Sequence, residues 1–485
     1  SGGKQLFSSC FSVFSNELIN AKKRTIKMLR ITSNRFLGAV CGQTNAIASM
    51  ATAPSTTKSK YPKNIVLIEG VRTPFVQSGT AFNDVMAYEL QKHAILSLIR
   101  RTGVPKDKIE YVSVGTVIQE PKTSNIARES VLSAGLSDKI PAHTVTQACI
   151  SSNQAITSAI GYIAAGAVDV AIAGGVELLS DVPIRFSRKM RKLMLAANKV
   201  KKPQQYLSLL AQFRPGFLAP ELPSISEFSS NETMGHSGDR LAATFRVSRG
   251  EQDEYALRSH SLADKAQKDG LLTDIEPITV GKGRVEKDNG IRVSSLQDMA
   301  KLKPAFIRPH GTVTAANASF LTDGASACLL MTEEKAKEFG LKPKAYLREF
   351  VYVSQDPKDQ LLLGPTYATP KVLERAGLSL NDIDVFEYHE AFAGQILANL
   401  KAMDSDWFAQ NFMGRKSKVG QVPIEKLNTW GGSLSIGHPF GATGVRLVTT
   451  AANRLIKEGG RYGLVAACAA GGLGHGMLVE RYPNK

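Results

Sequence analysis

HTVTQACISSNQAITSAIGYIAAGAVDVAIAGGVE, residues 143–177, decides the fold of this 485-residue chain. The alternation over His143–Thr146 is typical of a strand, and Val168–Ala173 reads as a short buried strand that ends at Gly174–Gly175. Between them, small apolar residues recur at helical spacing, which predicts a helix packed closely against a sheet: Ala155, Ile156, Ala159, Ile160, Ile163 and Ala164. The stretch therefore predicts strand, sharp turn, helix and strand, with Cys149 at the turn.

A cysteine at a helix N-terminus meets unpaired N–H groups and the helix dipole, both of which favour its thiolate. Cys149 is therefore a candidate nucleophile, and the alternative is a buried structural cysteine. The five cysteines are scattered and form no CxxC pair: Cys10, Cys41, Cys149, Cys328 and Cys468. This spacing argues against a zinc site or a disulfide framework and favours a reducing compartment.

The composition is typical of a soluble globular protein, with 43% hydrophobic and 21% charged residues. No apolar run reaches the ~18 residues of a membrane-spanning helix. The net charge of +17 is concentrated at the start, because residues 1–63 hold ten Lys/Arg and one acid, Glu17. A basic segment rich in Ser, Thr, Asn and Ala predicts a mitochondrial transit peptide; a disordered basic tail is the alternative. Residues 1–62 are therefore excluded from the fold.

Ordered structure is expected from a buried strand at residues 64–68, followed by helices at 85–101 and 125–134. Residues 181–319 have long polar connections and many prolines. Within them, the helix Ser248–Lys268 is expected to be charged and to face solvent. Residues 320–331 return to the character of a buried strand.

A basic amphipathic segment spans residues 185–218. Residues 185–202 carry eight Lys/Arg and no acid. Phe186, Met190, Leu193, Met194 and Ala197 recur at helical spacing opposite the charges, and an apolar stripe continues to Phe217. Such a segment is predicted to contact an anionic membrane surface or a partner; packing on its own protein is the alternative.

The chain also looks internally duplicated. Residues 98–112 resemble residues 373–386, since both read helix, glycine stop, acidic turn and buried strand. Likewise, the helix and strand after Cys149 parallel residues 441–456 and 462–467. Two related α/β halves would place equivalent loops around one cleft.

Three loops in the second half carry reactive residues. His389-Glu390-Ala391-Phe392 follows a predicted strand, GHPFGATG (437–444) leads into a helix, and Cys468-Ala469-Ala470-Gly471-Gly472 follows the strand 462–466. A single cysteine or histidine is weak evidence for an active site. Two cysteines and two histidines, each at the end of a strand or helix in a duplicated fold, are much stronger evidence.

These motifs resemble those of the thiolase family from about residue 64 to the end. Further matching motifs are GVRTPF (70–75), NETMG (231–235), KLKPAF (301–306) and GTVTAANAS (311–319). The resemblance implies an α/β thiolase fold: two duplicated βαβ-type halves in a layered αβαβα core with an inserted loop domain. It divides the chain into an extension (1–62), a first half (63–180, completed by about 320–343), a loop domain (181–319) and a second half (344–485).

The resemblance also implies the chemistry of a 3-ketoacyl-CoA thiolase of fatty-acid β-oxidation. Cys149 would be the nucleophile, His438 the base that ionises it, and Cys468 the acid and base of the second step. The backbone N–H groups of Cys149 and Ala470 would form one oxyanion site, and His438 with His389 the other. Two positions depart from the family pattern: His389 replaces a frequent asparagine, and Ala470 a usual glycine.

For CoA, the resemblance implies contacts from Ser319 and from Met234, Phe306 and Phe392, although core packing is an equal alternative for Phe306. It implies no metal, no permanently bound cofactor and no nucleic-acid partner, with CoA as co-substrate. The HEAF motif and the basic insertion are most similar to those of long-chain thiolases in trifunctional complexes. A homodimeric core assembled with an α subunit, in the mitochondrial matrix and at the inner membrane, is therefore expected.

Three other functions remain open at this point. A short-chain acetoacetyl-CoA thiolase would share every motif. The carrier-protein condensing enzymes share the fold but pair their cysteine with two histidines, and Cys468 disfavours them. A non-catalytic thiolase-fold scaffold would hold a partner enzyme at a membrane and would not need its cysteines.

Overall fold

The computed structural model describes residues 61–224 and 226–483 of the chain. The chain divides after Thr56 into two units, and the described residues all belong to the second. The predicted transit peptide lies outside the described residues, as does almost all of the extension over 1–62. Among the described helices, none combines the length and the apolar character that crossing a membrane requires.

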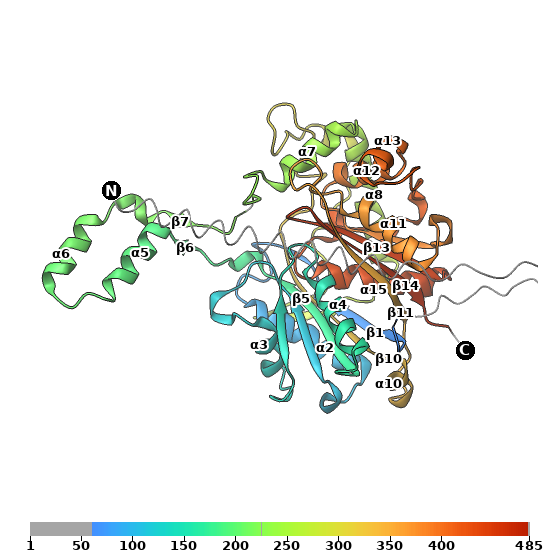
Figure 1. Ribbon diagram of the computed structural model, residues 1–485, viewed down its shortest axis with the longest axis horizontal. Helices are drawn as coiled ribbons and strands as arrows, with labels where there is room; N and C mark the ends of the chain where they lie inside the picture. Colours follow the sequence, from blue (N-terminus) through green and yellow to red (C-terminus); the bar gives the residue numbers. More distant parts are fainter. Residues whose placement is uncertain (1–60, 225, 484–485) are drawn as a thin grey trace, which may run out of the picture. The chain divides into compact units, whose positions relative to one another are not determined.

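A mixed sheet runs through the second unit (Figure 1), in the order β12-β13-β14-β11-β1-β10-β5-β3-β4, with β2 paired to β10. Parallel pairing occurs between β12 and β13 and among β5, β3 and β4, and the other pairs are antiparallel. The strands are β1 Ile65–Arg72, β2 Val76–Gln77, β3 Tyr111–Gly115, β4 Ala142–Val145, β5 Val170–Glu177, β10 Thr322–Thr332, β11 Ala345–Ser354, β12 Val385–Tyr388, β13 Tyr462–Ala469 and β14 Leu473–Arg481. Two small ribbons pair β6 Arg185–Phe186 with β7 Pro220–Glu221, and β8 Ile278–Val280 with β9 Gly283–Val285.

The predicted duplication is visible in the sheet. The two halves meet where β1 pairs β11 at only two residue positions. Each half carries the same irregularity: the register shifts between Leu67 and Glu69 in β1, and between Leu347 and Glu349 in β11. In both bulges the glutamate accepts a hydrogen bond from the N–H of the next residue. A shared bulge with the same side-chain contact is strong evidence that the halves have a common origin.

Helices form three layers around the two half-sheets. The central helices are α4 Ser151–Ala164 and α15 Thr443–Glu458, which share one apolar core with both half-sheets. Helices α2 Ala87–Thr102 and α3 Ile126–Ser133 cover the outer face of the first half-sheet, and α11 Gly364–Ala376 and α12 Ala393–Met403 that of the second. The predicted layered arrangement of helices and sheets is confirmed. The other helices are α5 Arg188–Ala197, α6 Pro203–Gln212, α7 Met234–Thr244, α8 Arg249–Lys268, α9 Leu296–Ala300, α10 Glu333–Glu338, α13 Asp406–Phe412 and α14 Ser433–Ile436.

Glycines allow the two halves to approach closely. A Cβ on Gly175 would lie 1.9 Å from the carbonyl oxygen of Gly441, and one on Gly444 would lie 2.5 Å from the backbone nitrogen of Asn153. Gly174 and Gly175 lie inside β5, so the prediction that they end this strand was wrong. These two glycines permit close packing within the sheet and do not form a turn.

Helix α8 also differs from its prediction. It was expected to face solvent, but seven of its residues are buried, including Gln252, Asp253 and Ser259. These polar side chains find hydrogen-bond partners in the interior, which a hydrophobic pattern does not reveal.

Helices α5 and α6 form a hairpin apart from the central sheet (Figure 1). Neither helix has a buried residue. Phe213 packs edge-on against Phe217 within the hairpin. Phe186, Met194 and Leu210 are 49%, 45% and 68% exposed, so part of the predicted apolar stripe faces outward. Leu195 and Leu207, which the prediction did not include, are also exposed, at 64% and 67%.

Candidate active site

Cys149 lies in the turn between β4 and α4. Ala148 adopts a left-handed backbone conformation, with φ of 46°, just before it. Ser151 closes the turn, because its hydroxyl donates to the carbonyl of Ala148 and accepts from the N–H of Gln147. A non-glycine residue in this conformation is uncommon and marks a constrained backbone. The N–H groups of Cys149 itself and of Ala470 are directed at the Cys149 sulfur.

His438 lies in the loop before α15, and its hydrogen bonds identify its neutral tautomer. Its Nδ1 lies 2.7 Å from the Oγ1 of Thr443, whose hydroxyl donates to the carbonyl of Pro439. That hydroxyl has one hydrogen, so it must accept from an Nδ1–H of His438. The Nε2 of His438 then carries a free lone pair, and this atom is buried with no hydrogen-bond partner among the described residues.

His389 follows β12 directly and lies against His438, with ring centroids 4.0 Å apart. Its Nδ1 lies 2.9 Å from the Oγ of Ser433, and its Nε2 is buried without a partner among the described residues. One ring nitrogen of each histidine and the sulfur of Cys149 all lie within 4.8 Å of one another. Since both Nδ1 atoms are bonded to hydroxyls, the Nε2 atoms are the ones available to the sulfur. These three side chains are also a set that could hold a metal ion.

Cys468 is buried in the last part of β13, which extends to Ala469 and not only to Ala466 as predicted. It belongs to an apolar cluster with Leu241, Val313 and Phe392. Burial raises the pKa of the Cys468 thiol, and the proximity of Cys149 raises it further. A buried thiol with a raised pKa holds its proton, as a general acid must.

Burial also raises the pKa of Cys149 to about 12, despite the two N–H groups that oppose this change. The prediction of a thiolate was therefore wrong for the resting site, because loss of solvation outweighs the two N–H groups at the sulfur. The pKa of His438 is well below its usual value, owing to burial first and then to His389 and Arg446. Burial and Arg446 likewise lower the pKa of His389 to about 3. Both imidazoles are neutral at physiological pH.

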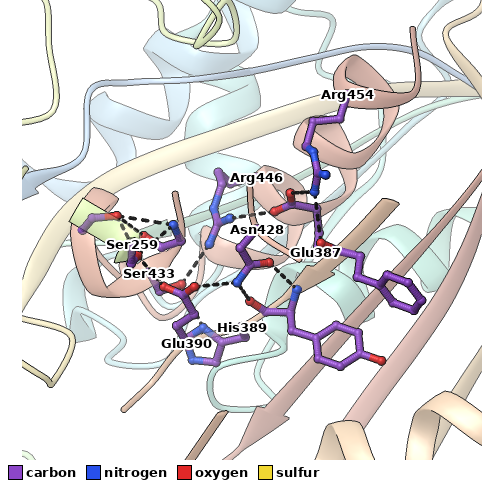
Figure 2. Close-up of polar contacts among 12 residues, drawn as sticks. Ser259, Glu387, His389, Glu390, Asn428, Ser433, Arg446 and Arg454 are labelled. Carbon is purple, nitrogen blue, oxygen red and sulfur yellow. Dashed lines mark hydrogen bonds and ion pairs between the residues drawn. The ribbon is translucent and has the colours of Figure 1, made fainter. Parts of the chain in front are cut away.

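A buried polar network surrounds His389 (Figure 2), and it was not predicted from the sequence. Arg446 of α15 donates to Ser433 and faces Glu387, which pairs with Arg454 at 2.7 Å. Next to it, Glu390 accepts hydrogen bonds from its surroundings: Tyr255 and Ser259 of α8, Asn428 and the N–H of Leu434. Arg446 lies within the apolar pattern of α15, and this position could have indicated the network, since a buried arginine needs polar partners.

Glu177 at the end of β5 joins the two halves at the site. One carboxylate oxygen accepts from the N–H of Ile118, and the other from Val117 and from Gly441 in the His438 loop. Burial raises the pKa of Glu177 to about 7, although the three N–H groups favour its charged form. The sequence motif included Glu177 but did not reveal this function.

The residues predicted to contact CoA also converge. Phe306 meets Phe392 edge-on, with ring centroids 6.2 Å apart, and Gly235 packs under Phe306. Met234 packs on the apolar cluster that contains Phe392 and Cys468. Ser319 lies beside the HEAF loop, where its N–H donates to the carbonyl of Ala391.

Comparison with known proteins decides the family. The model of the thiolase N-terminal domain matches residues 65–334, and that of the thiolase C-terminal domain matches residues 341–481. The chain belongs to the thiolase family. The predicted family and its acyltransferase class are thereby confirmed.

This thiolase is 70% identical to the mitochondrial trifunctional enzyme subunit beta of Bos taurus, over 90% of this chain and 93% of that protein. It is 61% identical to a probable 3-ketoacyl-CoA thiolase of Caenorhabditis elegans, over 89% of this chain and 97% of that protein. Its fold matches the crystal structure of the Bacillus anthracis acetyl-CoA acetyltransferase with a TM-score of 0.75 and 33% identity. That match covers 87% of this chain and all of the other.

Proposed function

We propose that this thiolase cleaves a 3-ketoacyl-CoA with CoA to give acetyl-CoA and a shortened acyl-CoA, through an acyl group on Cys149. One observation carries the proposal: residues almost three hundred positions apart meet in one site, where Cys149, His389 and His438 lie within 4.8 Å. The thiol, the base and the buried acid are the groups that this reaction needs.

In the first step, the Nε2 of His438 takes the proton of Cys149, and the thiolate attacks the 3-keto carbon. The free lone pair on that nitrogen suits the step. The bond between C2 and C3 then breaks, leaving the acyl group on Cys149 and the electron pair on the enolate of acetyl-CoA. Because the resting thiol is neutral, transfer to His438 generates the nucleophile only when substrate is positioned.

Cys468 completes the cycle. Its thiol protonates the C2 carbon of the enolate, and acetyl-CoA leaves. The resulting thiolate takes the proton of incoming CoA, whose sulfur attacks the acyl thioester. Cys149 leaves as a thiolate, and His438 returns to it the proton taken in the first step. The raised pKa of Cys468 favours the first transfer and makes its thiolate a strong base for the second.

Two sites would hold the developing negative charge. The N–H groups of Cys149 and Ala470, which face the sulfur, suit the oxygen of the 3-keto group. His438 and His389 suit the thioester oxygen of the enolate. Loss of one such donor typically costs about 2.7–4 kcal/mol of barrier. Ala470 contributes a backbone N–H, so its extra methyl group does not remove the donor.

Met234, Phe306 and Phe392 are proposed to line the channel for the pantetheine of CoA, with Ser319 as its polar contact. Their convergence beside Cys468 supports this assignment. CoA enters as co-substrate, and the proposal includes no permanent cofactor and no metal.

A thiolysis assay with a series of 3-ketoacyl-CoA substrates tests the function. We expect CoA-dependent cleavage by the wild type and none by C149A. Cleavage that survives in C149A would reject the mechanism. A preference for the four-carbon substrate would assign this thiolase to the acetoacetyl-CoA class.

The resemblance to a subunit named beta supports assembly of a homodimeric core with an α subunit in the mitochondrial matrix. Intact-mass measurement of the complex purified from mitochondria tests this; an isolated dimer would reject it. The predicted domain boundaries and the transit peptide form part of the same proposal.

The α5–α6 hairpin is proposed to contact the anionic surface of the inner membrane. Its exposed Leu195, Leu207 and Leu210 stand beside a segment with eight basic residues and no acid. Apolar side chains flanked by cations bind anionic lipid through both burial and charge. Pelleting with cardiolipin vesicles should weaken when these leucines are replaced by serine, and should be unchanged for the exposed Trp407→Ser. Undiminished pelleting would instead assign the hairpin to a protein partner.

A further inference from the structure

The two active-site histidines both direct Nε2 at the substrate, but their hydrogen-bond partners select different tautomers. The Nδ1 of each is bonded to a hydroxyl, of Thr443 for His438 and of Ser433 for His389. The difference lies in what each hydroxyl does next. Thr443 donates its hydrogen to a carbonyl, whereas Ser433 accepts a hydrogen from Arg446 at 2.8 Å.

The arginine determines the direction of the second chain. A guanidinium N–H can only donate, so Ser433 is an acceptor toward Arg446. Of the described residues, His389 is then the one partner left for the Ser433 hydroxyl hydrogen, which would otherwise be buried and unpaired. The hydroxyl therefore donates to the Nδ1 of His389, and a neutral imidazole that accepts at Nδ1 carries its proton on Nε2.

Arg446 is held in a position from which it can donate to Ser433. Its side chain is 1% exposed and lies against the carboxylate of Glu387, which Arg454 holds from the other side (Figure 2). Burial keeps both imidazoles neutral, and the positive charge of Arg446 lowers the pKa of His389 and of His438 further. A neutral ring has one N–H, so its position decides whether the ring donates or accepts.

We propose that Arg446 and Ser433 are positioning residues that lock His389 as the tautomer with an Nε2–H, which makes it a permanent hydrogen-bond donor to the substrate oxygen. His438, set the other way by Thr443, presents a lone pair and acts as the base. The site thus places a donor and an acceptor on two adjacent rings, whose centroids are 4.0 Å apart. This inference rests on the proposed thiolysis and adds the residues that divide the two functions.

A double-mutant cycle between Ser433 and His389 tests the proposal. Without the Ser433 hydroxyl, His389 can move its proton to Nδ1 and turn a lone pair toward the oxygen. We expect S433A to lower kcat on the order of 10²-fold with little change in KM, as for loss of a donor that acts in the transition state. In H389N, the side-chain amide has no tautomer to set. Adding S433A to H389N should therefore cost less than about threefold.

The matched control is S435A, which removes another fully buried serine hydroxyl from the same helix without touching His389. We expect S435A to leave kcat within about threefold of the wild type. The proposal is overturned if S433A lowers kcat by the same factor in the wild-type and H389N backgrounds. It is also overturned if S433A and S435A lower the kcat of the wild type equally. If S433A does not fold, S433C fills the space with a weak donor and gives the same cycle. Absence of thiolysis in the wild type would instead reject the proposed function.

Discussion

Burial decides which protons the active site holds. With the pKa of Cys149 raised to about 12, only about one thiol in ten thousand would ionise unaided at pH 8. The reaction therefore depends on His438, whose neutral Nε2 can take the proton once substrate arrives. Cys149 and His438 therefore share one proton, which lies on the thiol at rest and on the imidazole during attack.

Replacing His438 by asparagine removes the base and keeps a polar side chain of similar reach. We expect the rate of Cys149 acylation to fall about 10²–10⁴-fold at pH 7.5, the range for general-base catalysis. In H438N this rate should rise about tenfold per pH unit between pH 7 and 9, because only the thiolate reacts. Single-turnover acylation followed by intact mass measures both. A loss below tenfold, or a rate independent of pH, would contradict the assignment.

Glu177 gives a prediction about stability. Its folded-state pKa of about 7 lies above the ordinary 4.5, so the folded state holds a proton that the unfolded state has released. Stability from this group is therefore present below pH 4.5 and is lost as pH rises to about 7, by at most about 1.4 kcal/mol per pH unit. Urea unfolding at pH 5, 6 and 7 should show this extra slope in the wild type and not in E177Q. Parallel slopes would contradict it.

At the scale of elements, the central helices α4 and α15 bring the site together. Their N-termini are bonded, because the N–H of Val445 donates to the Ser152 hydroxyl at 3.2 Å. Close contact requires Gly444, where a Cβ would lie 2.5 Å from the backbone nitrogen of Asn153. Since α4 follows Cys149 and α15 follows His438, this contact sets the distance between nucleophile and base.

Substituting Gly444→Ala should therefore separate the two helices. We expect a loss of stability of about 1–3 kcal/mol, as for overpacking, and a fall in thiolysis on the order of 10²-fold. The control is Gly161→Ala in α4, where a Cβ meets no atom within 4 Å; it should keep activity and gain up to about 1 kcal/mol. Urea unfolding and the thiolysis assay measure both variants. Equal activity of the two would contradict the close-contact account.

The sequence predicted elements whose pattern is local, and it failed where partners are distant. The small-residue periodicity after Cys149 correctly identified α4, and the repeated glycine stops match Gly103 and Gly377, which end α2 and α11. Helix α8 was misjudged because its buried polar residues bond to elements far along the chain. Ser433 and Arg446 were missed for the same reason: their importance depends on contacts that only the fold creates.

At the scale of the whole molecule, the two halves share one core and one site. Strands of both half-sheets pack on α4 and α15 in a single apolar cluster. The described halves are therefore expected to unfold together. Both tryptophans, Trp407 and Trp430, report on the second half, and labelling of the buried Cys328 reports on the first. The two probes should give the same urea midpoint; separated midpoints would show halves that unfold independently.

The central claim is that Cys149 and Cys468 divide the chemistry, one carrying the acyl group and the other the proton. Mixing the enzyme with a 3-ketoacyl-CoA but no CoA, followed by peptide mass analysis, tests it most directly. The account predicts one acyl group per active site on Cys149 in the wild type, and almost none in C468A, where the enolate has no acid. An acyl group on Cys468, or full acylation of C468A, would contradict it.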